Sequence, residues 1–235
     1  MTLLTKILRE RRPTVRPEDL SLTFVAVTLL YPPLPRFKGN ELPDFYSEVC
    51  KRHQFDAFSL VGDSGALLET EAERRLKIER EELSYEEHVR NIRDAFPMVK
   101  QRTVDLVNDA SQHFGLRLFL PQDCTMRALW PVPEDLGDVD DELREKAFNI
   151  RDDQFEQLGQ VSGVGMHLTG HSGEGGDFGW LLEIAPYLPE EGNLFVELSS
   201  HQHGAMGKAD DVGDFLQTSY DFVTNNVVAF VNTFL

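Results

Sequence analysis

Histidines and carboxylates fall on alternate positions of one stretch of this sequence, from Val161 to His203. Alternate side chains of a strand point to the same face of a sheet. Apolar residues take the even positions of three runs in this stretch, VSGVGMHLTGH, FGWLLEIA and NLFVELSSHQH. The odd positions hold the titratable side chains His167, His171, Glu183, Glu197, His201 and His203. We therefore expect three strands with one core face and one polar face.

The register of these strands decides which polar side chains meet. The connecting segments SGEGGD and PYLPEEG contain the glycine and proline residues typical of hairpin connections. Consecutive strands that pair and keep their parity would place polar side chains in rows across the sheet. In the register we expect, one row contains His167, Glu183 and Glu197, and another contains His171, Gly179 and His201.

Such a polar face could act either as a protein contact or as a metal site. His201 and His203 point the same way, and two further histidines could approach from a neighbouring strand, so zinc or another divalent metal could find about four ligands. A metal site of this kind would make the protein a metal-dependent hydrolase. Its candidate ligands are His167, His171, His201 and His203, and Glu183 or Glu197 would be the general base.

The alternative is a non-enzymatic binding or assembly protein. Its polar face would pair His with Glu without metal and would meet a protein partner or another copy of the chain. None of the histidine spacings is a recognised metal signature. We therefore favour this interpretation, and we expect no cofactor.

Two glycine-containing motifs are similar to functional sequences but fit turns better. GDSGA resembles the nucleophile motif of chymotrypsin-like proteases, but Ala66 stands where a second glycine belongs, and His53 is the only histidine upstream. The glycines of GVGMHLTGHSGEGGDFG lie between predicted strands and lack a lysine, whereas a phosphate-binding loop joins a strand to a helix.

Composition excludes several classes of partner. The chain of 235 residues has a formal net charge of −17, which would repel nucleic acid. No apolar run approaches the length of a membrane span, and no signal-peptide pattern occurs at the start. Two cysteines are too few for a disulfide scaffold. We expect a cytoplasmic protein with neither a nucleic-acid nor a membrane partner.

The order of predicted elements suggests an internal duplication of residues 21–115 and 116–235, preceded by a basic arm of residues 1–20. Each half is expected to contain a strand, a helix, about three strands and a long helix. Aromatic residues followed by prolines, at Tyr31 and Trp130, end the first strand of each half. The fold class is therefore α+β: two β-α-β-β-β-α halves form one curved antiparallel sheet with the long helices packed on one face.

Three details of this scheme can be checked individually. Ser84 and Glu87 form a capping-box pattern that predicts the start of a helix. A helix is expected over residues 142–158, and His53, His88 and His113 are expected near helix ends. The final helix, residues 210–235, is expected to bury Val212, Leu216, Ser219, Val223, Val227, Phe230 and Phe234.

The element order resembles the tandem-repeat architecture of TATA-binding-protein-like folds, a likeness of topology that implies nothing about DNA. The segments PPLP, SYEEHVRNI and FVNTF also look like those of a sporadically distributed family of uncharacterised bacterial proteins of about this length. No activity is assigned to that family, so this resemblance implies no catalytic residues.

Overall fold

The computed structural model describes residues 15–233 except 35–36, 38–39, 62–64, 72, 90–94, 133–140, 142, 149–162, 173–176 and 190–191. The first half contains β1 (Ser21–Leu30), α2 (Glu41–His53), β2 (Ala57–Val61), β3 (Gly65–Glu69), β4 (Arg74–Ile78), β5 (Glu82–His88) and α3 (Ala95–Phe114). The second contains β6 (Leu120–Pro131), the π-helical turn η3 (Leu143–Phe148), β7 (Met166–Ser172), β8 (Phe178–Pro186), β9 (Asn193–Gln202) and α6 (Ala209–Asp221). The final helix continues through η6 (Phe222–Val227) and α7 (Val228–Val231).

The strands form one nine-stranded antiparallel sheet in the order β2-β3-β4-β5-β1-β6-β9-β8-β7. In each half the first strand pairs with the last, as β1 with β5 and β6 with β9, and β1 and β6 meet at the centre. The predicted α+β class with a curved antiparallel sheet is confirmed. The first half has one strand more than we expected, because the segment predicted to begin a helix at Ser84 forms the strand β5.

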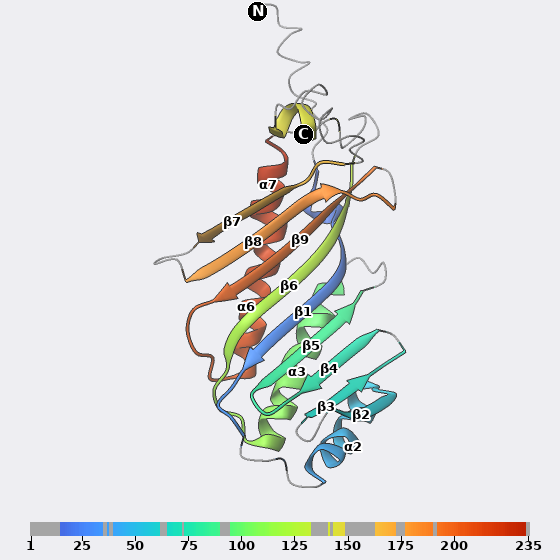
Figure 1. Ribbon diagram of the computed structural model, residues 1–235, viewed down its shortest axis with the longest axis vertical. Helices are drawn as coiled ribbons and strands as arrows, with labels where there is room; N and C mark the ends of the chain where they lie inside the picture. Colours follow the sequence, from blue (N-terminus) through green and yellow to red (C-terminus); the bar gives the residue numbers. More distant parts are fainter. Residues whose placement is uncertain are drawn as a thin grey trace, which may run out of the picture.

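All the long helices lie on one face of the sheet, behind the strands in the view of Figure 1. One core, which includes Leu29, Phe45 and Leu106, packs α2, α3 and part of α6 against the strands of the first half and against parts of β6 and β8. A second core, which includes Trp130 and Ile184, packs the end of the final helix against the strands of the second half. The opposite face of the sheet carries none of the described helices (Figure 1).

The final helix buries a different stripe at its end than the spacing predicted. Val223 and Val227 are buried as expected, but Phe230 is 38% exposed, and Val228 and Val231 are buried instead. The π-helical turn η6 lies directly before them. A π turn takes an extra residue, so the buried stripe moves by one position. Phe234 lies outside the described residues.

The segment predicted to begin a helix at Ser84 is the strand β5. Leu83 and Tyr85 point into the core and alternate with partly exposed residues, and β5 pairs with both β1 and β4. Pairing on both sides outweighs the local capping pattern. Consequently His88 ends a strand, whereas His53 and His113 lie at helix ends as predicted.

The start of the described chain is tied to its end. Val15 is buried, its N–H donates to Asn232 Oδ1 (2.9 Å), and its carbonyl accepts from Asn232 Nδ2 (2.9 Å). Trp130 Nε1 donates to the carbonyl of Arg16 (3.0 Å). Residues 1–14 of the predicted basic arm and most of the helix predicted over 142–158 lie outside the described residues. Across the described ranges, no helix is both long and apolar enough to cross a membrane.

Candidate binding face

The six residues predicted to share a polar face do so on the side of the sheet opposite the helices, which we call the open face. Even-numbered residues of β8 and β9 such as Leu182, Ile184 and Val196 are buried in the second core. His167 pairs with Glu183, and Glu183 with Glu197. The second expected row is also present, since the neighbours of Gly179 are His171 and His201. The predicted register is confirmed.

The first of these rows continues across the centre of the sheet into the first half. It runs from β7 to β5 through His167, Glu183, Glu197, Arg127, Phe24 and His88.

Neighbours in this row contact one another. His167 Nε2 lies 3.5 Å from Glu183 Oε2, and Arg127 Nε donates to Glu197 Oε2 (2.5 Å). The Arg127 guanidinium lies 4.8 Å from the ring centre of Phe24, a cation–π contact. The Phe24 ring in turn lies 4.9 Å from that of His88. Both signs of charge and aromatic surface therefore follow one line across six strands.

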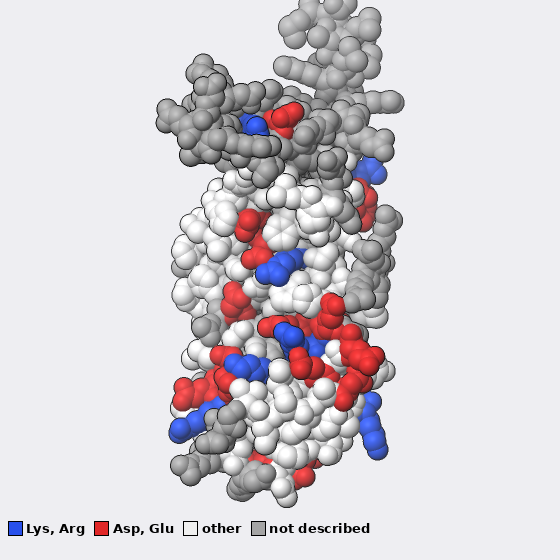
Figure 2. Space-filling model, turned by 45° about the vertical axis from the view of Figure 1, so that its right-hand side comes forward, with Lys and Arg blue, Asp and Glu red and all other residues white. Residues whose placement is uncertain are grey.

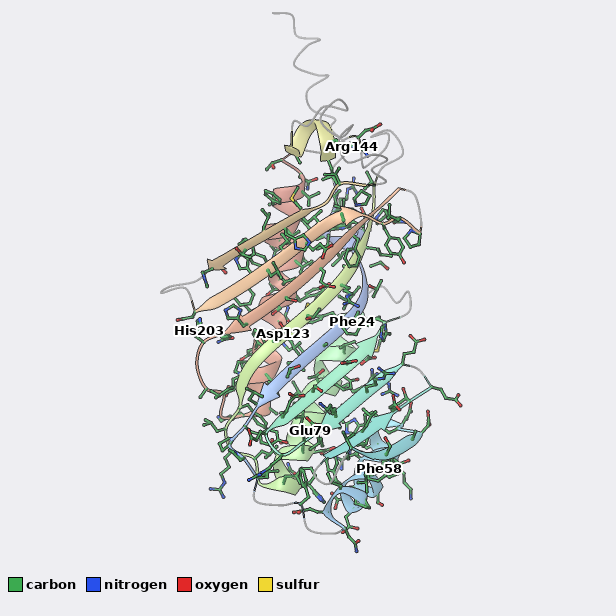
Figure 3. All side chains as sticks on the ribbon, viewed as in Figure 1. Phe24, Phe58, Glu79, Asp123, Arg144 and His203 are labelled. Atoms are coloured by element: carbon green, nitrogen blue, oxygen red, sulfur yellow. The ribbon has the colours of Figure 1, made fainter. Side chains whose placement is uncertain are left out.

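The second row brings three imidazoles together. A Cβ placed on Gly179 would lie 2.2 Å from His201 Nε2, so the imidazole of His201 occupies the space above this glycine. The ring centre of His201 lies 6.2 Å from that of His171 and 5.4 Å from that of His203. Figure 3 shows Phe24, Asp123 and His203 along the open face.

Asp123 on β6 interacts electrostatically with His201 of this group. Burial raises the pKa of Asp123 above its ordinary value, and the nearby Glu197 raises it further. The hydrogen bond from Thr125 Oγ1 (2.7 Å) and the charge of a protonated His201 act in the opposite direction. Asp123 is thus a carboxylate whose ionised form is better satisfied when His201 carries a proton.

The candidate metal ligands do not share one row: His167 lies in the first row, His171 and His201 lie in the second, and His203 follows the end of β9. His167 and His171 are four residues apart on β7, which separates their Cα atoms by roughly 13 Å. In the part of the chain that the structure describes, no three or more His, Cys, Asp or Glu side chains are grouped so that they could hold a metal ion.

Several residues of the open face were not among those we predicted. Phe24, Arg127, Asp123 and His88 all come from the central strands β1, β6 and β5. The sequence of β6 shows the alternation, because the apolar Cys124 and Met126 alternate with the polar Thr125 and Arg127. In the structure the first two are buried and the other two are partly exposed. The sequence did not predict His88 on this face, because the capping-box pattern at Ser84 and Glu87 indicated a helix in place of the strand β5.

The first half of the open face carries fixed charges. Arg75 Nε donates to Glu69 Oε1 (2.9 Å), and Lys77 Nζ lies 2.9 Å from Glu79 Oε2 and 3.5 Å from Glu82 Oε1. The hydrogen bond to Glu79 is the main reason that the pKa of Lys77 is raised. Figure 2 shows acidic and basic side chains crowded together over the lower half of the molecule.

Carboxylates outnumber lysine and arginine on the described part of the open face. The carboxylates include Glu69, Glu79, Glu82, Glu86, Asp123, Glu183 and Glu197, and the cations include Arg75, Lys77 and Arg127. Three cavities between described residues lie instead on the helix side, beside α2, α3 and α6.

No protein-family model matches this chain, and no curated protein matches it.

Proposed function

We propose that this chain is a non-enzymatic binding protein that docks another protein on the open face. The observation that supports this most is the extent of a polar face that no described helix covers. Nine strands about 4.8 Å apart give a width of roughly 38 Å, and strands of this length extend for roughly 20 Å. The resulting area, on the order of 800 Å², matches one side of a standard protein interface.

The shape of the site favours a protein over a small molecule. Small-molecule sites are concave and mostly apolar, and three cavities lined by described residues lie on the helix side. The open face instead mixes ion pairs with partly exposed apolar residues such as Phe24 and Leu181. Such a mixture is typical of contact surfaces between proteins.

The charge of the molecule indicates the kind of protein that would bind. A chain with a net charge of −17 repels a second copy and attracts a basic surface. The excess of carboxylates on the open face acts in the same direction. We therefore propose that the occupant is a protein with a basic contact surface, and that binding weakens as the pH falls, because imidazoles then gain positive charge.

The experiment is capture of partners by the immobilised full chain with wild type and two charge-reversal variants. Glu183→Lys changes the open face, and Asp214→Lys makes the same change at an exposed residue of α6. A partner counts only if its binding can be rebuilt from two purified components. We expect a basic protein that binds wild type and Asp214→Lys but not Glu183→Lys. A rebuilt partner that binds Glu183→Lys as tightly as wild type would refute the proposal.

Two further measurements separate the alternatives. Sedimentation over a concentration series detects self-association, and a dimer that dissociates in the double variant His201→Ala, His203→Ala would make a second copy the occupant. Metal analysis of untagged protein tests the metal-dependent hydrolase. One equivalent of metal that this double variant loses would replace the binding proposal with the hydrolase.

A further inference from the structure

A cavity on the helix side, remote from the open face, is lined by three arginines. We call it the arginine pocket. It has a volume of about 350 Å³ and lies between the end of α2, the start of β4 and the first turns of α3. Its lining includes Arg52, His53, Arg74, Arg102 and Asp105. Three guanidinium groups around one cavity are unexpected in a chain whose net charge is −17.

Arg74 is the residue that sets this cavity apart. Only 8% of Arg74 is exposed, and its Nη1 donates to the carbonyl of His53 (2.9 Å). Among the described residues, no carboxylate forms an ion pair with Arg74 within 4 Å, although Glu87 is its direct partner across the β4–β5 pair. Arginine carries five N–H donors in a fixed planar arrangement. Arg74 therefore presents a largely buried guanidinium at the wall of a cavity.

The other two arginines are held in place by carboxylates. Arg52 pairs with Asp109, which also contacts His53 Nε2 (2.9 Å). Arg102 pairs with Glu87 on β5. These carboxylates anchor the side chains and offset part of the charge of the pocket, and Glu87 is also the cross-strand neighbour of Arg74.

Burial alone would lower the pKa of Arg102, but its hydrogen bond and charge interaction with Glu87 raise that pKa above the ordinary value. Arg102 is thus held in position at the wall of the pocket as a cation.

We propose that the arginine pocket binds the phosphate group of a small ligand, with Arg74 as the principal contact. Guanidinium groups are suited to phosphate because their paired N–H groups match its oxygens. A phosphate dianion offers three acceptor oxygens and nearly two negative charges, more than a single carboxylate offers to three arginines. The volume of the pocket falls at the small end of the range for ligand sites, which fits a compact phosphomonoester or inorganic phosphate.

The test uses inorganic phosphate and the full-length chain. Thermal unfolding and calorimetric titration are measured with phosphate, with succinate as a carboxylate, and with sodium chloride at equal ionic strength. A site that binds only the folded state raises its melting temperature in the presence of ligand. We expect the melting temperature to be highest with phosphate, lower with succinate and lowest with sodium chloride. An equal response to phosphate and sodium chloride in wild type would overturn the proposal without any variant.

The chain offers a matched pair of variants for the same measurement. Arg74→Met removes the proposed contact, and Arg75→Met removes the same charge one residue later, on the open face. We expect Arg74→Met to weaken phosphate binding by about tenfold or more, because hydrogen bonds to charged groups are the strong ones. Arg75→Met is expected to bind as wild type does. An equal response in the two variants would also overturn the proposal.

The stability of the unliganded variants gives a separate reading. Replacing a buried cation that forms no ion pair within 4 Å among the described residues by an apolar residue is expected to leave stability unchanged or to raise it. If the Arg74→Met variant is more stable than wild type but its melting temperature does not rise with phosphate, the charge of Arg74 serves binding and not stability. If Arg74→Met does not fold, Arg74→Lys is titrated instead, and its affinity is expected to lie below that of wild type because lysine lacks the paired donors. An Arg74→Lys affinity equal to that of wild type would count against Arg74 as the principal contact.

Discussion

The two halves of this molecule attach their long helix to the sheet with different chemistry. In the first half, Glu87 on β5 accepts from Arg102 on α3 and from the hydroxyl of Tyr85 (2.6 Å). In the second half, Ser200 on β9 contacts Ser219 on α6 through their hydroxyl groups (2.8 Å). The same arrangement of strand and helix therefore holds either an ionic or a neutral polar contact.

The open face shows a second difference between the halves. The first half carries ion pairs of Lys and Arg with Glu, residue types whose ordinary pKa values lie outside the range from about pH 5 to pH 8. The second half carries His167, His171, His201 and His203, and histidine is the residue type whose ordinary pKa lies within this range. The comparison teaches that topology specifies where polar groups lie, while residue type decides whether the pH can change them.

The largest effect is expected from removing residues 224–235, which should unfold the second core and leave the first core without its partner. The deletion removes the buried Val227, Val228 and Val231 together with the Asn232 contact to Val15. Burial of each valine contributes about 1.5 to 3 kcal/mol, and their sum is comparable with the net stability of a domain, about 5 to 15 kcal/mol. Circular dichroism during heating is expected to show no cooperative transition.

Deletion of residues 233–235 is the control for this truncation. It keeps Asn232 and all three valines, so a cooperative transition close to that of wild type is expected. If the longer truncation melted cooperatively and stayed soluble, the end of the final helix would be peripheral and the second core would not depend on it.

The next effect compares the two helix contacts directly. Arg102→Met leaves the buried Glu87 without its cation, which is expected to cost about 3 kcal/mol. Ser219→Ala removes a hydroxyl from a neutral contact in which Ser200 keeps its bond to the carbonyl of Cys124 (3.2 Å), and a cost of about 1 kcal/mol is expected. Chemical denaturation of both variants measures the difference. Equal costs would show that the two contacts do not differ in the way their chemistry suggests.

A smaller effect, an increase in stability, is expected from replacing Asp123 on β6, which pairs with β1 where the two halves meet. Burial raises the pKa of Asp123 in the folded state, so its ionisation destabilises the fold above the ordinary aspartate pKa of 3.8. Asp123→Asn should therefore stabilise the protein by up to about 1 kcal/mol at neutral pH, and this gain should disappear as the pH falls below 3.8. Denaturation at several pH values tests this. A variant that is less stable than wild type at pH 7 would contradict it.

The smallest effect is expected from the fixed charges of the first half. Lys77→Met removes the contacts of Lys77 to Glu79 and Glu82, and all three side chains are partly exposed. Surface ion pairs contribute about 0 to 1 kcal/mol and are screened by salt. The stability lost in Lys77→Met should therefore be slight and should become smaller still in high salt. If the proposed contrast with the histidines holds, this loss of stability should be the same at pH 8 and at pH 5.

The part of the fold that could be predicted is the part where one signal dominates. In β8 and in β9 up to Leu198 every even residue is apolar, so parity alone defined the core face. In β5 a local capping pattern competed with alternation, and only the neighbouring strands β1 and β4 decide between them. The shift of the final stripe from Phe230 to Val231 depends on a π turn, for which spacing carries no signal.

The candidate sites show the same limit. The histidine rows lie on consecutive strands and were therefore readable from the sequence. The arginine pocket joins Arg52, Arg74 and Arg102 from three elements that packing brings together, and no spacing relates them. Likewise, Arg127 reaches the row of His167 only because β6 pairs with β9, a contact between residues 70 positions apart in the chain.

The contact between Val15 and Asn232 also affects how the chain is made. The two residues are separated by 217 positions, so the buried Val15 leaves the ribosome long before its partner exists. At about 5 to 20 residues per second, this interval is roughly 10 to 40 s. Until then Val15 and Leu20 have no final helix to pack against and remain an exposed apolar segment that a chaperone could hold. The second core can therefore close only after synthesis of Asn232, whereas the residues of β1 to α3 are already complete when Phe114 emerges.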